Sequence, residues 1–337
     1  MTLAERIGWG FLGCGRVADR RVAPVFAQLD DAALVAVWSR DPNKAGEFAQ
    51  RHSTPQVYDR IDDLLADEDV QVVYVSTPNA LHLEHAGRCL ESGRHVLVDK
   101  PMALNANEAA KMIEIARRHH RLLGVMHQQR FHPANVHLLR LLDEGRLGKV
   151  NFIRMQIAMW YPPQATWRQD VNLAGGGVAI DLGPHAVDLL LEMGGSVTRV
   201  DAILRNLQFP GPLEDFCQVR LDFASGAIGL LDVSYCGHHY GGRIEIFGSE
   251  GSFSSDGALQ CAPTYDTWHR RGDATAEACR EVSTINCFRK AVEDFNDAVR
   301  HRSRPTVDML DGFRVMRIID AVYASAHRRQ AVDLAPY

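Results

Sequence analysis

The stretch Ile7–Ala18, IGWGFLGCGRVA, decides the fold of this chain. Its first half is apolar and short enough for a buried strand, and apolar residues then recur at helical spacing. Gly13 allows a tight turn between the two, and Gly15 lacks the Cβ that would hold a diphosphate away from the backbone. Ala18 is small where helix and strand must pack closely. This G-x-G-x-x-A pattern between a strand and a helix predicts a dinucleotide site.

The composition indicates a water-soluble protein of about two domains. The chain has 337 residues with 46% hydrophobic content, so each domain can bury a core of its own. Its 37 basic and 42 acidic residues give a net charge of −5 without long charge runs, and we expect no nucleic-acid or membrane partner. Seven cysteines without a C-x-x-C pair argue against a disulfide framework. Without a signal peptide or a transmembrane-length apolar run, a cytoplasmic protein is expected.

Up to about residue 124, short apolar strands alternate with helical patterns. Examples of the strands are Ala33–Trp38, Val70–Ser76 and His95–Asp99. Strands of this kind, each followed by a helix, are typical of a parallel sheet covered on both faces. The sequence therefore predicts an α/β fold whose N-terminal domain, residues 1–124, is a doubly wound parallel sheet of the Rossmann type.

From residue 125 onwards the pattern changes. A helix is expected around Ala179–Met193, and the later strands alternate polar and apolar residues with glycine-rich turns between them. The segment Cys261–Ala278 is polar and aperiodic, which favours a surface loop. Two helices, about Ser283–Arg300 and Asp308–His327, close the chain. We therefore expect a C-terminal α/β domain, residues 125–337, with a large, mostly antiparallel open sheet.

The end of the second predicted strand bears on cofactor choice. An NAD site usually places Asp or Glu there to bind the ribose 2′-hydroxyl, whereas this chain has Ser39 followed by Arg40. A guanidinium suits a 2′-phosphate and can stack on adenine. Asp41 complicates this interpretation, although it also fits a cap for a helix beginning at Pro42. NADP is therefore favoured, with NAD as the alternative.

Two more loops carry polar groups to the same edge of the predicted sheet. The loop Ser76–Asn79 follows the fourth strand, and Asp99 and Lys100 follow the fifth. Asn79 alone would fit a helix cap, and His82 alone would fit a packed histidine. A lysine that ends a buried strand is unusual. Because ligands bind at the carboxyl edge of such sheets, three polar loops there favour a functional role for Lys100.

A third motif lies in the second predicted domain. The glycine run 175–177 is expected to be a flexible turn into a helix, on which Asp181 and His185 are i,i+4 neighbours on one face. A carboxylate that orients an imidazole is a usual acid/base arrangement, although a solvated helix face has the same pattern. An Asp/His pair also suits zinc, but no further ligands follow at a recognisable spacing. We therefore expect no metal site.

Taken together and in this order, the motifs resemble the glucose–fructose oxidoreductase/inositol dehydrogenase (Gfo/Idh/MocA) family. The resemblance covers nearly the whole chain and departs from the family at Asp99, where Glu is more usual. It implies that Lys100 and His185 are catalytic with Asp181 beside them, and that Gln128, Trp167 and Arg168 lie near nicotinamide or substrate. Cofactor contacts are then expected from Gly13, Gly15, Arg16, Val17, Ser39, Arg40, Ser76, Thr77, Pro78, Asn79, His82, Asp99, Lys100 and Gln128, and substrate contacts from Trp167 and Arg168.

The resemblance implies an NAD(P)-dependent dehydrogenase or reductase that transfers a hydride between nicotinamide and a hydroxyl-bearing carbon of a sugar, sugar derivative or cyclitol. It also implies a homodimer or homotetramer formed through the open sheet. One alternative is a glycoside-cleaving enzyme that uses retained NAD for transient oxidation. Another is a non-catalytic nucleotide-binding relative, which the presence of both Lys100 and His185 disfavours.

Overall fold

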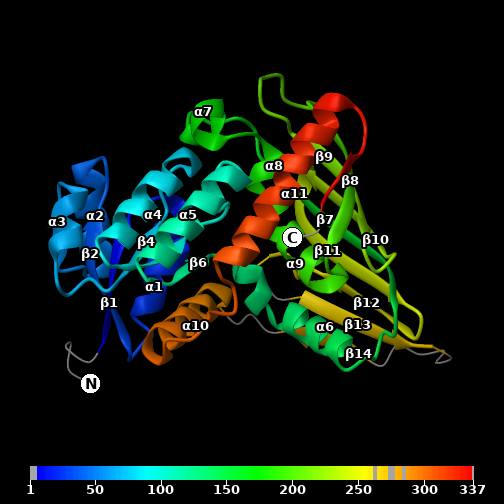
Figure 1. Cartoon of the computed structure of the whole chain (residues 1–337), viewed down its shortest axis with the longest axis horizontal. Coiled ribbons are helices and arrows are strands. Elements are labelled where there is room, and N and C mark those ends of the chain that lie inside the picture. The colour runs from blue at the N-terminus through cyan, green and yellow to red at the C-terminus, as the bar shows by residue number, and fades with distance from the viewer. Residues whose placement is uncertain (1–5, 261–263, 272–277, 283–285, 336–337) are drawn as a thin grey trace. The chain divides into compact units, whose positions relative to one another are not determined.

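The structure is a computed structural model that describes residues 6–260, 264–271, 278–282 and 286–335. The chain forms two compact units (Figure 1). The first takes in the chain up to Met126 together with Phe288–Phe313, and the second takes in His127–Cys287 together with the chain from Arg314. No helix among the described residues combines the length and the apolar character needed to cross a bilayer.

The first unit is built on a six-stranded sheet. All of its strand pairs are parallel, in the order β3-β2-β1-β4-β5-β6. Every residue of β1 is buried, as expected for a central strand with both faces covered. The predicted Rossmann sheet is therefore confirmed. The strands are β1 (Ile7–Leu12), β2 (Ala32–Trp38), β3 (Gln56–Tyr58), β4 (Val72–Val75), β5 (His95–Val98) and β6 (Leu123–Val125).

Helices of the first unit follow its strands, and one arrives from much later in the chain. They are α1 (Ala23–Phe26), α2 (Pro42–His52), α3 (Ile61–Ala66), α4 (His82–Glu91), α5 (Ala106–Arg118) and α10 (Cys287–His301). The sequence assigned all of 288–313 to the C-terminal domain, whereas the contacts place it in the first unit. Phe295 of α10 packs edge-on to Trp9 of β1 with ring centroids 5.9 Å apart. The Trp9 indole also donates a 2.9 Å hydrogen bond to Asn296 Oδ1.

The helix after the glycine turn is less regular than its apolar spacing predicts. Residues Ala18–Val22 form a π-helical segment, and α1 begins only at Ala23. Pro24 has no N–H to donate to the carbonyl of Arg20, so the i→i−4 ladder is interrupted there. Periodicity reports which face is buried and not this local change of winding.

The second unit is built on a nine-stranded sheet in the order β14-β13-β12-β11-β7-β10-β9-β8-β15. Only the β7/β10 pair is parallel among these described strands, which confirms the mostly antiparallel prediction. The strands are β7 (Val150–Trp160), β8 (Val197–Arg205), β9 (Phe216–Phe223), β10 (Ile228–Ser234), β11 (Cys236–Gly248), β12 (Gly251–Asp256), β13 (Thr264–Arg270), β14 (Ala278–Val282) and β15 (Val332–Asp333).

Two helices of the second unit, α8 (Val178–Asp181) and α9 (Gly183–Gly194), pack against its sheet. α9 contacts β7 and β10, and α8 contacts β9 and β10. Figure 1 shows the long helix α11 (Met309–Arg328) continuing into this unit. The others are α6 (Pro133–Asp143) and α7 (Val171–Ala174), with short 3₁₀ turns at Gln128–Phe131 and Trp167–Gln169.

The prediction of a surface loop over Cys261–Ala278 is wrong for its described part. Residues Thr264–Arg270 form β13, which pairs with β12, and Ala278 begins β14. Trp268 lies opposite Phe253 and is only 6% exposed. One buried aromatic residue among polar neighbours is too weak a pattern to indicate a strand. Residues 261–263 and 272–277 of this segment, and 283–285 of the predicted closing helix, lie outside the described residues.

Candidate active site

The glycine turn lies where the strand order of the first unit reverses, between β1 and β4. The Gly13 N–H donates to the Trp38 carbonyl at 2.9 Å, and the Ser76 hydroxyl donates to the Gly13 carbonyl at 3.1 Å. Gly13 has φ +102°, and a Cβ there would lie 2.8 Å from the Ser76 carbonyl oxygen, so only glycine fits. The loops after β1, β2 and β4 therefore meet at one edge, as predicted.

Gly15 differs from Gly13 in what surrounds it. A Cβ at this position would meet only the Ser76 carbonyl oxygen, at 3.7 Å, and the residue itself is exposed. The neighbouring chain therefore does not require a glycine here, but the space that a Cβ would take is the space through which a diphosphate approaches the backbone. This open cradle at a topological switch point fits a dinucleotide. Arg16 is exposed and Val17 is half-buried in the same turn.

After β2, Asp41 is the N-cap residue of α2. Its carboxylate accepts hydrogen bonds from the backbone N–H groups of Asn43 at 3.1 Å and Lys44 at 3.4 Å, so it caps α2. Ser39 is half-buried, and its hydroxyl accepts from the Asp41 N–H at 3.3 Å. Arg40 is exposed, and no carboxylate among the described residues forms an ion pair with it.

His82 connects the loops that follow β4 and β5. Its ring is 1% exposed, with Nδ1 2.8 Å from the Pro101 carbonyl oxygen and Nε2 2.9 Å from the Thr77 carbonyl oxygen. Burial lowers the pKa of His82, and the Asp99 carboxylate opposes that shift. Thr77 and Asn79 are themselves buried, and Pro78 is half-buried. The contacts of His82 are thus those of a residue that holds the loops after β4 and β5 together.

Lys100 follows β5 and is half-buried, as is Asp99 before it. The Lys100 N–H donates to Asp99 Oδ1 at 2.9 Å, and the Lys100–Pro101 peptide bond is cis. Burial, with a further contribution from the Asp99 carboxylate, raises the pKa of Tyr74 well above its ordinary value. Asp99, although shorter than the glutamate usual in the family, thus still accepts a hydrogen bond from the backbone N–H of Lys100.

In the second unit, the glycine run 175–177 is a closely packed turn and not the flexible one expected. Gly175 has φ +82° and ends α7. A Cβ on Gly176 would lie 1.9 Å from the Tyr323 hydroxyl, and a Cβ on Gly177 would lie 2.1 Å from the Glu214 carbonyl oxygen. Glycine is therefore required by close approach at two positions and by backbone conformation at the first.

Asp181 and His185 do not share one continuous helix, so that prediction is wrong. Asp181 ends α8, Leu182 stands between, and α9 starts at Gly183. Pro184 has no N–H for the next helical bond, and the His185 N–H donates to the Leu182 carbonyl at 3.2 Å in a tighter turn. Both Asp181 and His185 are half-buried.

The Asp181 carboxylate has two identified partners in the second unit. The Tyr235 hydroxyl donates to Asp181 Oδ2 at 2.6 Å, and Arg168 Nε lies 3.8 Å from the same oxygen. The Arg168 guanidinium also stacks over the Trp167 ring at 4.4 Å. Trp167, Arg168 and Asp181, all predicted from the sequence, thus form one group, while Gln128 is buried in the turn before α6.

Tyr235 belongs to this group of side chains but was not singled out from the sequence. It follows β10 and is 8% exposed. Burial, and then the Asp181 carboxylate, raise its pKa well above the ordinary value, so the hydroxyl keeps its proton and donates it in the hydrogen bond. Its one signal in the sequence is its place at the end of an alternating polar and apolar stretch, which does not distinguish it from other tyrosines.

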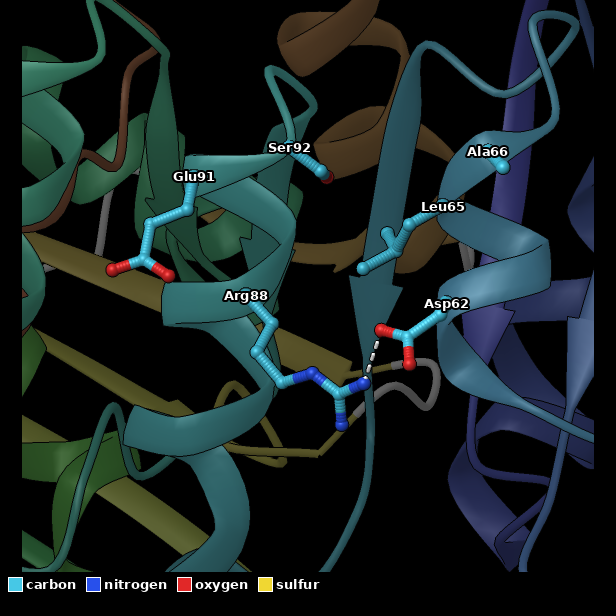
Figure 2. Close-up of a pocket in the computed structure, with 6 residues that line it drawn as sticks. All are labelled: Asp62, Leu65, Ala66, Arg88, Glu91 and Ser92. Carbon is cyan, nitrogen blue, oxygen red and sulfur yellow. Dashed lines mark hydrogen bonds and ion pairs between the residues drawn. The ribbon is translucent and has the colours of Figure 1, made fainter.

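A hollow elsewhere in the first unit carries no comparable chemistry. It lies between α3 and α4, and Figure 2 shows Arg88 pointing across it to form an ion pair with Asp62. Arg88 also lies 4.0 Å from Glu84, so its charge is already compensated. Ser92, just past the end of α4, lines it too, whereas the polar edge of the sheet lies at the start of that helix. Within the described parts of the chain, no three His, Cys, Asp or Glu side chains form a metal site.

Comparison with known proteins identifies the class of this chain. Residues 7–127 match the oxidoreductase family with an NAD-binding Rossmann fold, and residues 136–254 match the GFO/IDH/MocA C-terminal domain. The chain belongs to the Gfo/Idh/MocA family of nicotinamide-dependent oxidoreductases, which act on CH–OH groups of sugars and cyclitols. The resemblance drawn from its motifs is confirmed.

Three similar proteins illustrate the family. dTDP-3,4-didehydro-2,6-dideoxy-alpha-D-glucose 3-reductase of Saccharopolyspora spinosa is 32% identical over 256 residues, 74% of each chain. D-xylose 1-dehydrogenase (NADP(+)) 2 of Haloferax volcanii is 29% identical over 341 residues, covering 97% of this chain and 99% of the relative. The crystal structure of aldose-aldose oxidoreductase from Caulobacter crescentus complexed with glycerol superposes with a TM-score of 0.90 at 26% identity, covering 98% of this chain and all of that one.

Proposed function

We propose that the protein transfers a hydride between a nicotinamide cofactor and a hydroxyl-bearing carbon of a sugar, a sugar derivative or a cyclitol. The observation that carries the proposal is the group around Asp181, where Tyr235 and Arg168 supply a hydroxyl and a guanidinium to one half-buried carboxylate. Clustered donors and acceptors of this kind suit a polyhydroxylated substrate. The names of the family relatives, a xylose dehydrogenase among them, support this substrate class.

The cofactor, when bound, supplies or accepts the hydride. The residues of the first unit have the separate task of holding it, with its diphosphate at the Gly13–Gly15 cradle and its adenosine end at Ser39 and Arg40. An exposed guanidinium without a carboxylate partner suits a 2′-phosphate, because the charge is not already compensated. This supports NADP as the preferred cofactor.

Two charged or titrating residues complete the proposed chemistry. Lys100 binds the reacting oxygen through its ammonium and stabilises the negative charge that develops there. His185 takes the hydroxyl proton during oxidation, a task that suits imidazole because its ordinary pKa, about 6.5, is near working pH. Asp181 either orients the imidazole or binds a substrate hydroxyl. Trp167 and Arg168 contribute to the substrate side.

A homo-oligomer formed through the open sheet face belongs to the proposal. Leu231 and Val233 face the helices and are buried, whereas Ile228 is 36% exposed and Phe247 is 42% exposed on the opposite face. Phe247 also stacks on Phe152 of the neighbouring strand. Exposed apolar side chains gathered on one face of a sheet mark an interaction surface. Phe247→Asp should give a monomer by light scattering at micromolar concentration, whereas Val136→Asp on α6 should not; a monomeric wild-type protein would refute the oligomer.

The test of the main proposal is a panel of aldoses, sugar derivatives, aminocyclitols and inositols, each assayed for absorbance change with all four nicotinamide forms. Stable turnover with one substrate class and an external cofactor is expected. If the protein cleaves glycosides with a retained cofactor and no net redox change, the transient-oxidation alternative replaces the proposal. If it binds cofactor but converts no member of the panel, the proposed substrate class is wrong.

A further inference from the structure

The dipeptide Glu214-Asp215, just before β9, contacts the backbone of Tyr235 and the start of the helix that ends at Asp181. Glu214 binds the start of α8, which ends at Asp181. The Asp215 carbonyl oxygen accepts the Tyr235 N–H at 2.8 Å. One of these two adjacent residues thus contacts the helix that carries the Asp181 carboxylate, and the other contacts Tyr235, whose hydroxyl donates to that carboxylate. Neither was singled out by the sequence.

Glu214 accepts three successive backbone N–H groups at the beginning of α8. Its Oε1 accepts from Gly177 at 2.9 Å and from Ala179 at 3.1 Å. Its carbonyl oxygen accepts from Val178 at 2.9 Å. The first N–H groups of a helix have no partner within the helix, so these three bonds fix where α8 starts. Asp181 lies one turn later, and its own N–H donates to the Gly177 carbonyl at 3.1 Å.

The Glu214 carboxylate is held in turn from α11. The Tyr323 hydroxyl donates to the same Oε1 at 2.8 Å, and Glu214 is 9% exposed. Burial, and then the Glu214 carboxylate, raise the pKa of Tyr323 well above its ordinary value, so this donor also keeps its proton. The close fit of Gly176 against Tyr323 and of Gly177 against Glu214 leaves the turn no room to shift toward either residue.

Asp215 is fixed by a separate set of bonds. Its carboxylate accepts the N–H groups of Leu207, Gln208 and Phe209 at 2.7–2.8 Å. Burial acts to raise the pKa of Asp215, but these three donors outweigh it and the pKa is lowered. The carboxylate therefore remains ionised, and the carbonyl that receives Tyr235 has a fixed position. The two ends of the Asp181–Tyr235 hydrogen bond thus have one rigid common support.

We propose that Glu214 is a positioning residue for the redox reaction: it sets the start of α8 so that the Asp181 carboxylate is held against Tyr235 in the geometry that turnover requires. The inference rests on the proposed function, because it assumes that Asp181 takes part in that reaction. Glu214 acts through the backbone of α8 and does not touch the substrate.

The experiment compares Glu214→Gln with Tyr323→Phe and with Glu250→Gln as a matched control. Glutamine keeps the size of the side chain but loses the charge-assisted bonds, which are about twice as strong as neutral ones. We expect kcat to fall about tenfold in Glu214→Gln and severalfold in Tyr323→Phe, since each weakens the contacts to one oxygen. Cofactor Kd should be unchanged. Glu250 lies in the exposed turn before β12 and pairs with Arg271, so its variant should match the wild type.

Two further readouts separate positioning from a purely structural role. Amide exchange in the peptide covering residues 171–182 should accelerate in Glu214→Gln, since the three N–H groups lose their charged acceptor. In an Asp181→Asn background, the kcat loss caused by Glu214→Gln should largely disappear, because coupled residues are not additive. Glu214→Gln should also lower the melting temperature, and that fall should persist in the Asp181→Asn background.

The outcomes are distinct. An unchanged kcat in Glu214→Gln despite faster exchange overturns the positioning role and leaves the proposed function standing. A kcat loss of equal size with and without Asp181→Asn also overturns it, because the effect then does not pass through Asp181. If the wild-type protein converts no substrate of the panel, the proposed function fails and this inference fails with it. If Glu214→Gln does not fold, the same comparisons with Tyr323→Phe decide.

Discussion

The Tyr235 hydroxyl donates a 2.6 Å hydrogen bond to Asp181 Oδ2, although the two residues lie 54 positions apart in the chain. Tyr235 follows β10, and Asp181 ends α8. Because the pKa of Tyr235 is raised well above its ordinary value by burial and by Asp181, the hydroxyl remains a donor at any working pH. Asp181 is therefore held by a hydrogen-bond donor whose protonation state does not change with pH in the working range.

Tyr235→Phe should lower kcat/KM about tenfold, the effect of losing one hydrogen bond to a charged group. The position of the alkaline limb of the pH–rate profile should not move, since Tyr235 does not titrate in that range. A profile of kcat/KM between about pH 6 and 10 measures both. The control is Tyr58→Phe on β3, which removes a hydroxyl bonded to Asp67. Disappearance of the alkaline limb would assign it to Tyr235 and contradict this argument.

Lys100→Met should lower kcat by about two orders of magnitude, comparable to the loss of one preorganised donor in other enzymes. Methionine keeps most of the apolar stem and removes the ammonium. Cofactor affinity, measured by fluorescence titration, should stay within about twofold of the wild type. A loss of rate without a loss of cofactor binding marks an interaction made in the transition state. Lys111→Met on the exposed side of α5 is the control. Wild-type turnover in Lys100→Met would show that its charge has no catalytic role.

Arg40→Ala should weaken NADP binding at least about tenfold and NAD binding much less, because only NADP offers a 2′-phosphate for a charge-assisted contact. Dissociation constants for both cofactors, measured at two salt concentrations, check this. The control is Lys44→Ala, which removes an exposed cation from the same helix that Asp41 caps. Equal weakening of both cofactors, or an NAD preference in the wild type, would be evidence against the assignment to NADP.

The fold was largely predictable from short apolar segments. The completely buried β1 and the alternation of β7 each follow from periods that sequence displays directly. The strand β13 was missed because the burial of Trp268 depends on Phe253 of β12, which lies opposite it, and a local sequence pattern does not show such a contact. The assignment of α10 to the first unit depends on Phe295 and Trp9, which are far apart in the sequence.

The site was predictable in its residue types but not in its supporting contacts. Asp181 was identified by its spacing to His185, yet Pro184 divides the expected helix into two. The glycine run was identified, but its reason is the packing of Glu214 and Tyr323 against it. Neither residue lies near the glycine motif in sequence, so only the fold shows why the turn contains glycine.

Stability should fall in mild acid because of His95. Burial lowers its pKa to about 4, and its Nδ1 accepts the Leu122 N–H at 2.9 Å, which requires the neutral ring. The unfolded chain binds a proton at about pH 6.5 and the folded chain only near pH 4, so the free energy of unfolding decreases as pH falls through that window. His95→Asn, which keeps an acceptor but does not titrate, should flatten the melting temperature between about pH 6.5 and 4.5. His119→Asn on the same unit is the control; an unaltered acid slope in His95→Asn would assign the loss to other groups.

The proposed proton route is tested by comparing His185→Ala with Asp181→Asn. Oxidation releases a hydroxyl proton with the hydride, so a base must lie within hydrogen-bond reach of that oxygen. His185→Ala should reduce kcat by about 100-fold, the range typical of a lost general base, and should abolish the acidic limb of the pH–rate profile. Cofactor affinity should be nearly unchanged in both variants.

The size of the Asp181→Asn effect then separates its two proposed roles. Asparagine can still accept the hydroxyl hydrogen of Tyr235, but it loses the charge that pairs with Arg168. If Asp181 orients the imidazole, kcat should fall about tenfold with KM unchanged, because the base is still present but held less well. If Asp181 binds a substrate hydroxyl, KM should rise as well, and the loss in kcat/KM should approach that of His185→Ala. Wild-type turnover and pH dependence in His185→Ala would remove His185 from the route and leave the hydroxyl proton to be lost through Lys100.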